Sequence, residues 1–552
     1  MSRGTALALA IVMLAGPGCS LNMVDRKECT DNDDCIGFGA GSTCGAGGYC
    51  EVSTAPACTT NMECETLMGA GYVCNITTGV CELPDTSCTT DGECRNRSGF
   101  GYVCNATSHA CEFIPVADRS LRCNRTIPER LFIEGEFSNA IVFGSIVERN
   151  YEGDAVLENA AELAIAEANL DRTGLNGRTF GLVMCTDEAN AEFDSLIPDE
   201  GQSDVAVARY LVDKLGVRAI FGPTTSGRTQ AVYEDLRGTG TLIISPSATS
   251  PDLTTLDNPS PTDDNPGLLW RTVPPDSLQG RIMAEDMIAR AVTRVAVIVE
   301  TGPYGDGLAN VFVNAFTGMG GMVVGGLLSY GHMPPAASLA ERITDAYAAG
   351  AQEVLFISGL IGDEQEFLNG IIGQPGDDTT TIFLSDTAAT PDLLAGTPVE
   401  LYDQIRLTRP ALGSGPVYLA FVSAYRMRFP TIDPTQFGFI AQSYDAAWML
   451  VYGSAWSVFQ DGGQVTGLGI GKGMRHMSSG GELQIRSSSW PSARGAFMAG
   501  SSIDILGASG ALDYNPMTEE TEAGVEILSL MTCPAEWTFA LVSTPGGTGV
   551  CP

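Results

Sequence analysis

Histidine is scarce in this sequence, whose 552 residues include only three, His109, His332 and His476. None of them belongs to a metal-binding spacing such as H-E-x-x-H, and no Ser-His-Asp arrangement is indicated. The glycine-rich stretch GLGIGKG (467–473) has Lys472 where a dinucleotide-binding motif requires its third glycine. The sequence therefore predicts a protein that is not an enzyme and that needs no cofactor or metal.

Basic residues are also scarce in comparison with acidic ones. The 30 Lys and Arg residues stand against 66 Asp and Glu residues, which gives a formal net charge of -36 at pH 7. Proteins that bind DNA or RNA need basic side chains to neutralise phosphates, so the composition excludes nucleic acid as a partner. An anionic membrane surface is excluded as a partner for the same reason.

Long apolar runs are missing after the N-terminus, and no segment there has the 18 uninterrupted apolar residues of a transmembrane helix. The run TALALAIVMLA (5–15) follows Arg3 and precedes GPGCS, which contains Cys19. This arrangement is typical of a bacterial lipoprotein signal at 1–19, after which Cys19 carries the lipid. The alternative is an ordinary secretory signal. We expect a cell-envelope protein held at the outer or inner membrane by its lipid alone.

Cysteine is abundant, with 17 residues of which most lie in the first quarter of the chain. Residues 29–111 contain three four-cysteine units, and the last two share the spacing C-x5-C-x9-C-x6-C and the motif GYVCN. Disulfides would stabilise segments that are too small to form a core, whereas zinc favours C-x2-C pairs, which these units lack. The sequence does not determine the pairing within a unit. We interpret residues 20–122 as a stalk of three disulfide-rich modules.

Four cysteines remain outside the repeats and the signal. Cys533 and Cys551 are expected to close the C-terminal tail. Cys123 is then left for Cys185, since Cys123 precedes the first strand of the large domain and Cys185 follows the second.

From about residue 140 the sequence alternates between short apolar runs and segments with helical periodicity, and the alternation restarts after about residue 275. Continuous apolar runs of this length are typical of parallel strands covered on both faces. Regular alternation of strand and helix predicts an α/β fold with doubly wound parallel sheets in two similar lobes.

Two of the predicted strands end in hydroxyl groups, in GPTTSG (222–227) and in SPSATS (245–250). Ligands of open parallel sheets bind beyond the carboxyl ends of the strands, where the N-terminus of the next helix favours an anion. The alternative is that Thr225 or Ser226 only caps the following helix and that Thr249 only forms a turn.

Five stretches of the large domain follow one another as GDAVLENAAELAIAEAN, RAIFGPTTSGRTQAV, LIISPSATSPDLT, LWRTVPPDSLQGR and VAVIVETGPYGDGLA. In these stretches the domain resembles the type I periplasmic binding proteins, above all the leucine/isoleucine/valine-binding family. The resemblance implies a two-lobed Venus-flytrap domain over residues 123–552. The lobe boundaries that it implies are about 137–274 and 411–500 for the first lobe, and about 275–410 and 501–540 for the second.

The resemblance also implies the residues of a ligand site. A carboxylate would be bound by Ser226 and Thr249, and Thr225 is a further ligand-binding residue. An ammonium group would donate to the backbone of Ser247 or Ala248 and to Thr249. From the second lobe, Tyr304 would line the cleft and Asp386 would accept from the ammonium group.

One departure from the family concerns the ligand, since Leu360 and Ile361 stand where the family usually has an aromatic residue. We therefore expect an amino acid or a similar small carboxylate or amide, without assigning a branched-chain one. The protein is interpreted as the solute-binding subunit of an ABC importer, with an ABC permease as its partner. The long stalk is unusual for such a subunit, so a ligand-sensing or interaction lipoprotein without a transport role is the alternative.

Overall fold

The computed structural model forms two compact units, Met1–Ser87 and Cys88–Pro552. The helices of the described residues include none with the length and apolar character of a transmembrane span. The predicted signal with Cys19, as well as His332 and Ile361, lies outside the described residues. Those residues are 29–30, 42–44, 48–52, 58–68, 72–75, 80–82, 87–149, 152–186, 204–331, 336–360, 362–521, 523–533 and 536–551.

The first unit contains two antiparallel hairpins, the second of which follows a short helix. Disulfides take the place of an apolar core here, as the sequence predicted. The elements are β1 (Ser42–Cys44) with β2 (Cys50–Val52), and α2 (Asn61–Met68) before β3 (Val73–Asn75) with β4 (Val80–Glu82). The disulfides are Cys29–Cys44, Cys58–Cys74 and Cys64–Cys81, and Cys50 is also disulfide-bonded.

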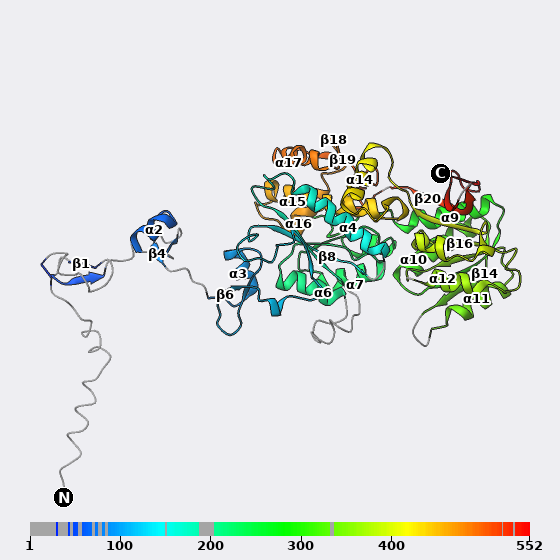
Figure 1. Ribbon diagram of the computed structural model, residues 1–552, viewed down its shortest axis with the longest axis horizontal. Coiled ribbons are helices and arrows are strands. Elements are labelled where there is room, and N and C mark those ends of the chain that lie inside the picture. The colour runs from blue at the N-terminus through cyan, green and yellow to red at the C-terminus, as the bar shows by residue number, and fades with distance from the viewer. Residues whose placement is uncertain are drawn as a thin grey trace, which may run out of the picture. The chain divides into compact units, whose positions relative to one another are not determined.

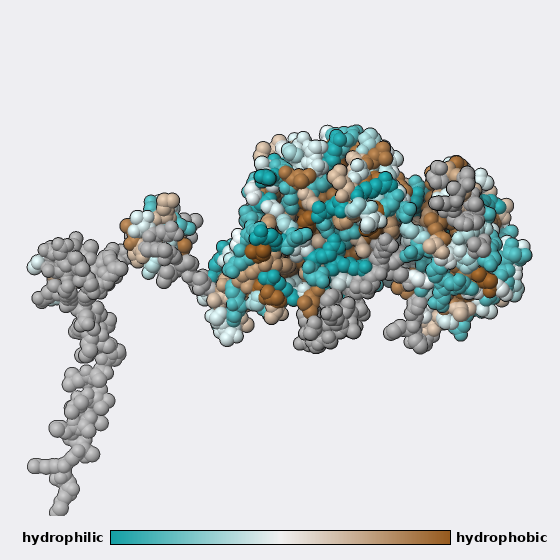
Figure 2. Space-filling model, viewed as in Figure 1, coloured by the Kyte–Doolittle hydropathy of each residue, from teal (hydrophilic) through white to brown (hydrophobic). Residues whose placement is uncertain are grey.

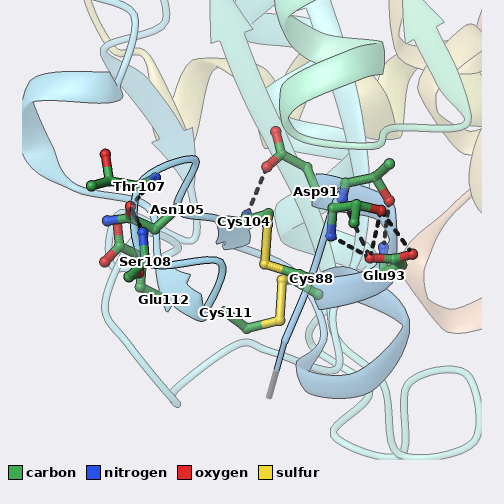
Figure 3. The surroundings of a disulfide bond; sticks show 12 residues. Cys88, Asp91, Glu93, Cys104, Asn105, Thr107, Ser108, Cys111 and Glu112 are labelled. Atoms are coloured by element: carbon green, nitrogen blue, oxygen red, sulfur yellow. Dashed lines mark hydrogen bonds between the residues drawn. A yellow bond between two sulfur atoms is a disulfide. The ribbon is translucent and has the colours of Figure 1, made fainter. Parts of the chain in front are cut away.

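The third four-cysteine module repeats the second with α3 (Asp91–Ser98), β5 (Tyr102–Cys104) and β6 (Cys111–Phe113). Its disulfides, Cys88–Cys104 and Cys94–Cys111, again join the first cysteine to the third and the second to the fourth. The Asp91 carboxylate accepts from the Cys104 amide at 2.7 Å (Figure 3). Asn61 makes the equivalent contact with the Cys74 amide at 3.0 Å. Because these cysteines are bonded in pairs, the zinc alternative is excluded for both modules.

This third module packs against the first lobe of the large domain. The Phe100 amide donates to the Ser138 carbonyl at 2.7 Å, and the Arg95 guanidinium donates to the Lys214 carbonyl at 2.5 Å. Phe100, Val103 and Ile114 are buried in the apolar core of that lobe. The sequence predicts that residues up to 122 belong to the stalk. The structure differs because this module buries apolar side chains that a free spacer would expose to water.

The first lobe is built on a six-stranded sheet of order β12-β11-β10-β8-β9-β7, parallel except for β7. Its strands alternate between two apolar cores, since Ile243 faces the core that contains α7 whereas Ile244 faces the core that contains α15. The strands are β7 (Arg125–Ile127), β8 (Ile141–Ile146), β9 (Phe180–Cys185), β10 (Ala219–Phe221), β11 (Leu242–Ser245) and β12 (Leu269–Arg271).

Helices cover both faces of this sheet (Figure 1). The longest of them, α15, is buried along nearly its whole length and packs against α4, α16 and α17. The helices are α4 (Glu152–Ala168), α6 (Asp204–Arg209) with a π-helical turn (Tyr210–Lys214), α7 (Ser226–Leu236), α8 (Asp252–Leu256), α14 (Gly415–Arg428), α15 (Ile440–Gln460), α16 (Gly467–Met474) and α17 (Trp490–Met498).

The second lobe contains an eight-stranded sheet of order β14-β13-β15-β16-β17-β20-β21-β22. Its first five strands are parallel and the last three are antiparallel. The strands are β13 (Arg294–Glu300), β14 (Met322–Tyr330), β15 (Glu353–Ile357), β16 (Thr381–Leu384), β17 (Ile405–Pro410), β20 (Val525–Cys533), β21 (Glu536–Val542) and β22 (Gly549–Val550). Around them lie α9 (Asp276–Ala289), α10 (Pro303–Gly318), α11 (Leu339–Ala348), α12 (Asp363–Ile371) and α13 (Pro391–Gly396).

The last lobe boundary differs from the expected one at residue 501. Strand β19 (Ile503–Leu506) pairs with β18 (Gly481–Gln484), and Ile503 and Ile505 are buried in the core of the first lobe. The chain joins the second sheet only at β20. The early boundary is wrong because the apolar side chains of β19 pack against the helices of the first lobe.

Both predicted disulfides outside the repeats are present. Cys123 is bonded to Cys185, and Cys533 is bonded to Cys551. The first bond ties the segment after the third module to β9, and the second ties the C-terminal tail to β20.

Hydrophilic residues dominate the face of the large unit in Figure 2, with apolar ones scattered among them, as the high charge leads one to expect.

Candidate functional site

A cavity of about 1080 Å³ lies between the two lobes and is lined by residues of both. From the first lobe it receives the residues that follow β10 and β11, together with the start of α4. From the second lobe it receives the residues that follow β13, β15 and β16. The site therefore lies at the carboxyl ends of parallel strands, where ligands of such sheets bind.

The predicted hydroxyl groups of the first lobe come together at this cavity. Thr225, Ser226, Ser247 and Thr249 all line it. Thr225 precedes the first residue of α7, but its side chain makes no capping hydrogen bond. The helix-cap alternative requires the Thr225 hydroxyl to accept from an amide of the first turn of α7, and it does not do so.

Two of these hydroxyls also shape the loops themselves. The Ser226 hydroxyl accepts from the Ser250 amide at 3.1 Å, and the Ser247 hydroxyl donates to the Thr224 carbonyl at 2.7 Å. These bonds hold the loop after β11 against the loop after β10. Ser226 and Ser247 thus combine a structural contact with a place on the cavity wall.

Thr249 differs from its neighbours. Thr249 is only 2% exposed, and its Oγ1 atom has no hydrogen-bond partner among the described residues. A buried hydroxyl without a partner costs about 1–3 kcal/mol, which a ligand atom at this position would offset. Of the lobe-one hydroxyls, Thr249 is the one best placed to gain a bond from a ligand.

Ala248 does not line the cavity. It is fully buried, its amide donates to the Ser245 hydroxyl at 3.1 Å, and its carbonyl accepts from the Arg271 guanidinium at 3.2 Å. Arg271 also donates to the Ser250 carbonyl at 2.8 Å and forms an ion pair with Glu520. The Ala248 carbonyl, which was expected to accept from an ammonium group, therefore accepts from Arg271 instead and makes a structural contact.

Tyr304 and Asp386 meet on the side of the second lobe, where both line the cavity. The Tyr304 hydroxyl donates to Asp386, which also accepts from the Gln279 amide group at 3.0 Å. Burial raises the pKa of Asp386, while these two hydrogen bonds act in the opposite direction. Burial, followed by the charge of Asp386, raises the pKa of Tyr304 well above its ordinary value. The phenol is therefore a neutral donor at physiological pH.

Sequence reasoning missed Asp276, the first residue of α9 in the crossing between the lobes. It is fully buried, and neither carboxylate oxygen has a hydrogen-bond partner among the described residues. Burial, reinforced by the charge of Asp386, raises the pKa of Asp276 well above its ordinary value. The Thr249 hydroxyl, which lies near the Asp276 carboxylate without the geometry of a hydrogen bond, and the charge of Arg271 lower that pKa by smaller amounts. Asp276 does not line the cavity, but it lies close enough to Asp386 for their charges to interact.

A further acidic group lies on the second lobe at the end of β13 and the start of α12. It consists of Glu300, Asp363 and Glu364, all of which line the cavity together with Leu360. Glu300 accepts from the Gly359 amide at 3.2 Å, and Asp363 accepts from the Ser358 hydroxyl at 2.8 Å. We call these three carboxylates the outer acidic cluster.

The charge of the cavity wall is strongly negative. Besides Asp386 and the outer acidic cluster, the lining includes Glu148, Asp154 and Asp392, whereas its basic residue is Arg228. Arg228 pairs with Glu148 at 2.8 Å. The carboxylates do not converge on a metal site, because the groups of three potential ligand atoms found in the described residues consist of cysteines alone.

The comparison with family models identifies the family. Residues 153–481, more than half of the chain, match the model described as "Periplasmic binding protein". The chain belongs to the periplasmic binding protein family. It is a family of binding proteins, so the prediction that the chain is not an enzyme agrees with its family.

Known members of this family are similar to parts of the chain. A Leu/Ile/Val-binding protein of Rhizobium johnstonii is 32% identical over 163 residues, which are 29% of this chain and 38% of that protein. A chemotactic signal transduction system substrate-binding protein of Halobacterium salinarum is 31% identical over 163 residues, 28% of this chain and 35% of that protein. The matches thus span less than half the length of these relatives.

Solved structures of periplasmic binding proteins confirm the fold. The crystal structure of a leucine-binding protein of Thermotoga maritima superimposes with a TM-score of 0.53 at 17% identity, over 72% of this chain and 97% of that chain. The predicted architecture, two lobes with doubly wound parallel sheets preceded by disulfide-rich modules, is therefore confirmed.

Proposed function

We propose that this chain is an extracytoplasmic solute-binding protein that captures an amino acid or a similar small carboxylate or amide between its two lobes. The observation that carries the proposal is the buried hydroxyl of Thr249, which faces the cavity without a partner among the described residues. Thr249 lies in the loop after β11, on the same cavity as the Tyr304–Asp386 pair.

The chemistry of the two walls matches the two ends of an amino acid. Hydroxyl groups and the N-terminal amides of α7 are suited to a carboxylate, which Thr225, Ser226 and Thr249 bind in this proposal. The Asp386 carboxylate, with Asp276 behind it, is suited to an ammonium group. Tyr304 orients Asp386 through its hydrogen bond, and Ser247 contributes to the wall beside Thr249.

In this proposal the protein delivers its solute to an ABC permease. Cys19 carries a lipid that holds the chain at a membrane of the cell envelope, and the disulfide-rich modules separate the lipid from the binding domain. The names of the relatives, a Leu/Ile/Val-binding protein among them, support an amino acid as the class of solute.

A second candidate function is ligand sensing without transport. Two observations favour it, namely the disulfide-rich modules before the binding domain and the similarity to a substrate-binding protein of a chemotactic system. The binding site is the same in both proposals, and they differ in the partner that detects the bound state.

The experiment that tests solute binding is a thermal shift screen of the disulfide-bonded chain against amino acids, amides and small carboxylates. A solute that binds only the folded state raises the melting temperature, since saturation at 100 times the dissociation constant adds about 2.7 kcal/mol of stability. We expect one of these classes to stabilise the chain. If none does so at millimolar concentration, the proposed class of solute is wrong.

A further inference from the structure

Two buried carboxyl groups lie near each other at the crossing between the lobes. Asp386 follows β16 and is 3% exposed, whereas Asp276 is the first residue of α9 and is fully buried. Gln279, one turn after Asp276 on the same helix, donates to Asp386 at 3.0 Å, so both acids adjoin the first turn of α9. Two carboxyl groups that share a buried site do not both ionise near neutral pH, so one of them keeps a proton.

Hydrogen bonds determine which of the two acids ionises. Asp386 accepts from the Tyr304 hydroxyl and from the Gln279 amide group, and both donors stabilise its ionised form. Asp276 has no such donors, because neither of its carboxylate oxygens has a hydrogen-bond partner among the described residues. Burial and the charge of Asp386 raise the pKa of Asp276 well above its ordinary value, which agrees with this difference. The proton therefore belongs to Asp276.

The groups that would keep Asp276 ionised are weak or engaged elsewhere. The charge of Arg271 lowers the pKa of Asp276, but by less than burial raises it. The Arg271 guanidinium pairs with Glu520 and also donates to the Ser250 carbonyl at 2.8 Å. The dipole of α9 favours an ionised carboxylate at its first residue, but burial without a hydrogen bond opposes ionisation more strongly. Tyr304, on α10, is a neutral phenol and brings no charge to Asp276.

A bound amino acid changes the charge around this pair of acids. Its ammonium group is proposed to lie beside Asp386, which lines the cavity, and the charges of Asp386 and Asp276 interact. A positive charge favours the ionised form of a nearby carboxyl group, and it offsets the repulsion between two ionised acids. Binding of the solute and ionisation of Asp276 should therefore favour each other, because such coupling is reciprocal.

We propose that Asp276 holds a proton in the ligand-free protein and that binding of an amino acid beside Asp386 releases this proton to the solvent. The step leaves Asp276 as a carboxylate, and the added negative charge balances the ammonium group of the solute. This proposal rests on the proposed function and adds a proton to its binding equilibrium. By linkage, the affinity rises with pH until the free protein loses the same proton, so the chain binds its solute more weakly in acid.

The test is calorimetric titration of the full disulfide-bonded chain with leucine, glutamine, glutamate and lysine, which represent apolar, amide, acidic and basic side chains. Titrations at about pH 6 in two buffers of different ionisation enthalpy give the number of protons released per solute bound. We expect about 0.5–1 proton for each amino acid that binds, and an affinity that rises about 3- to 10-fold per pH unit between about pH 5 and pH 7. The same acid without its α-ammonium group, isocaproate in the case of leucine, should not release a proton.

Three variants locate the proton. Asp276→Asn should abolish both the release and the dependence of affinity on pH, because an amide does not titrate. Asp252→Asn is the matched control, since Asp252 is exposed on α8 and does not line the cavity, and it should release as many protons as the wild type. Glu364→Gln tests the other candidate, because burial raises the pKa of Glu364, which lines the cavity, to about 7. The release should persist in this variant.

The outcomes separate the two proposals. If an amino acid binds without releasing a proton, Asp276 is already ionised in the free protein, and the linked proton is excluded while the proposed function stands. If Asp276→Asn releases as many protons as Asp252→Asn, the proton comes from another group, such as Glu364, and the proposal is wrong. If none of the four amino acids binds to the folded chain, an amino acid is excluded as the solute and the linked proton with it.

Discussion

At the scale of the single residue, Thr249 gives the sharpest test of the site. Thr249→Ala should weaken solute binding by about 10- to 100-fold, since a hydrogen bond to a charged group contributes about 1.5–3 kcal/mol. The melting temperature of the free protein should not fall, because the hydroxyl makes no hydrogen bond to the described part of the chain. Calorimetric titration with the solute found by screening measures the change in affinity.

The matched control for Thr249 is Thr255→Ala on the neighbouring helix α8. Thr255 is exposed and does not line the cavity, so its loss should leave the affinity unchanged. Equal affinities of the wild type and of Thr249→Ala would mean that the hydroxyl only forms a turn.

Asp276 predicts a pH dependence of stability. Its pKa is raised in the folded state, so the folded protein retains a proton there that the unfolded chain loses above pH of about 4. This group therefore destabilises the fold progressively as the pH rises from the unfolded pKa toward the folded one. Asp276→Asn removes this titratable group, and with it the cost of keeping the carboxyl protonated above its unfolded pKa, and should therefore stabilise the ligand-free protein at neutral pH.

Thermal melts of both proteins between pH 4 and pH 8 measure this difference. The melting temperature of Asp276→Asn should exceed that of the wild type most at the high end and least near pH 4. A difference that stays constant with pH would show that the Asp276 carboxyl titrates as it does in water.

The sequence allowed some of these residues to be predicted and not others. Thr225, Ser226 and Thr249 could be found because hydroxyls that follow buried parallel strands lie at the edge where ligands bind. Asp276 could not be found in this way, because an acid after two prolines is typical of an ordinary helix start. Its burial depends on the crossing between the lobes, which no local pattern describes.

At the scale of the element, the glycines of α16 pack this helix closely against α15. A side-chain carbon added at Gly473 would lie 2.7 Å from Cβ of Trp456 and 2.8 Å from Cα of Gly453. Gly473→Ala should therefore destabilise the fold by about 1–3 kcal/mol, the usual cost of overpacking a core. Chemical denaturation followed by fluorescence or circular dichroism measures this change.

Gly495→Ala in α17 is the control for this element. No atom lies within 4 Å of an added side-chain carbon at Gly495, so the gain in helix propensity should stabilise the protein by up to about 1 kcal/mol. If both substitutions stabilise the protein, the close contact between α15 and α16 does not limit packing there.

The same helix shows what a motif can and cannot reveal. The sequence of GLGIGKG departs from a dinucleotide-binding motif, and the structure shows that its glycines allow close contact with another helix. The pairing of the cysteine repeats was open for a similar reason, because pairing depends on which strands meet in the hairpins. The alternation of strands and helices, by contrast, is a local signal, and it predicted both sheets.

At the scale of the whole molecule, the boundary before Cys88 predicts the effect of truncation. A chain without residues 1–87 should keep the melting temperature and solute affinity of the full chain, because those residues form a separate compact unit. A chain without residues 1–122 should melt at a lower temperature, because it exposes the apolar surface that Phe100, Val103 and Ile114 cover. Thermal melts and titrations of the two truncated chains test this.

If both truncated chains are as stable as the full chain, the third module contributes nothing to the first lobe. If both are destabilised, the boundary lies earlier than Cys88. The predicted outcome would show that one of the three modules has become part of the binding domain, while the others remain separate from it.

The central claim, that a small solute binds between the lobes, is tested most directly by a crystal structure of the chain grown with the solute that stabilises it most. The account predicts electron density for one solute molecule in the cavity between the lobes, with a polar atom within hydrogen-bonding distance of the Thr249 hydroxyl and a cationic group beside Asp386. Density for the solute at another place on the chain, with this cavity occupied by water alone, would contradict the account.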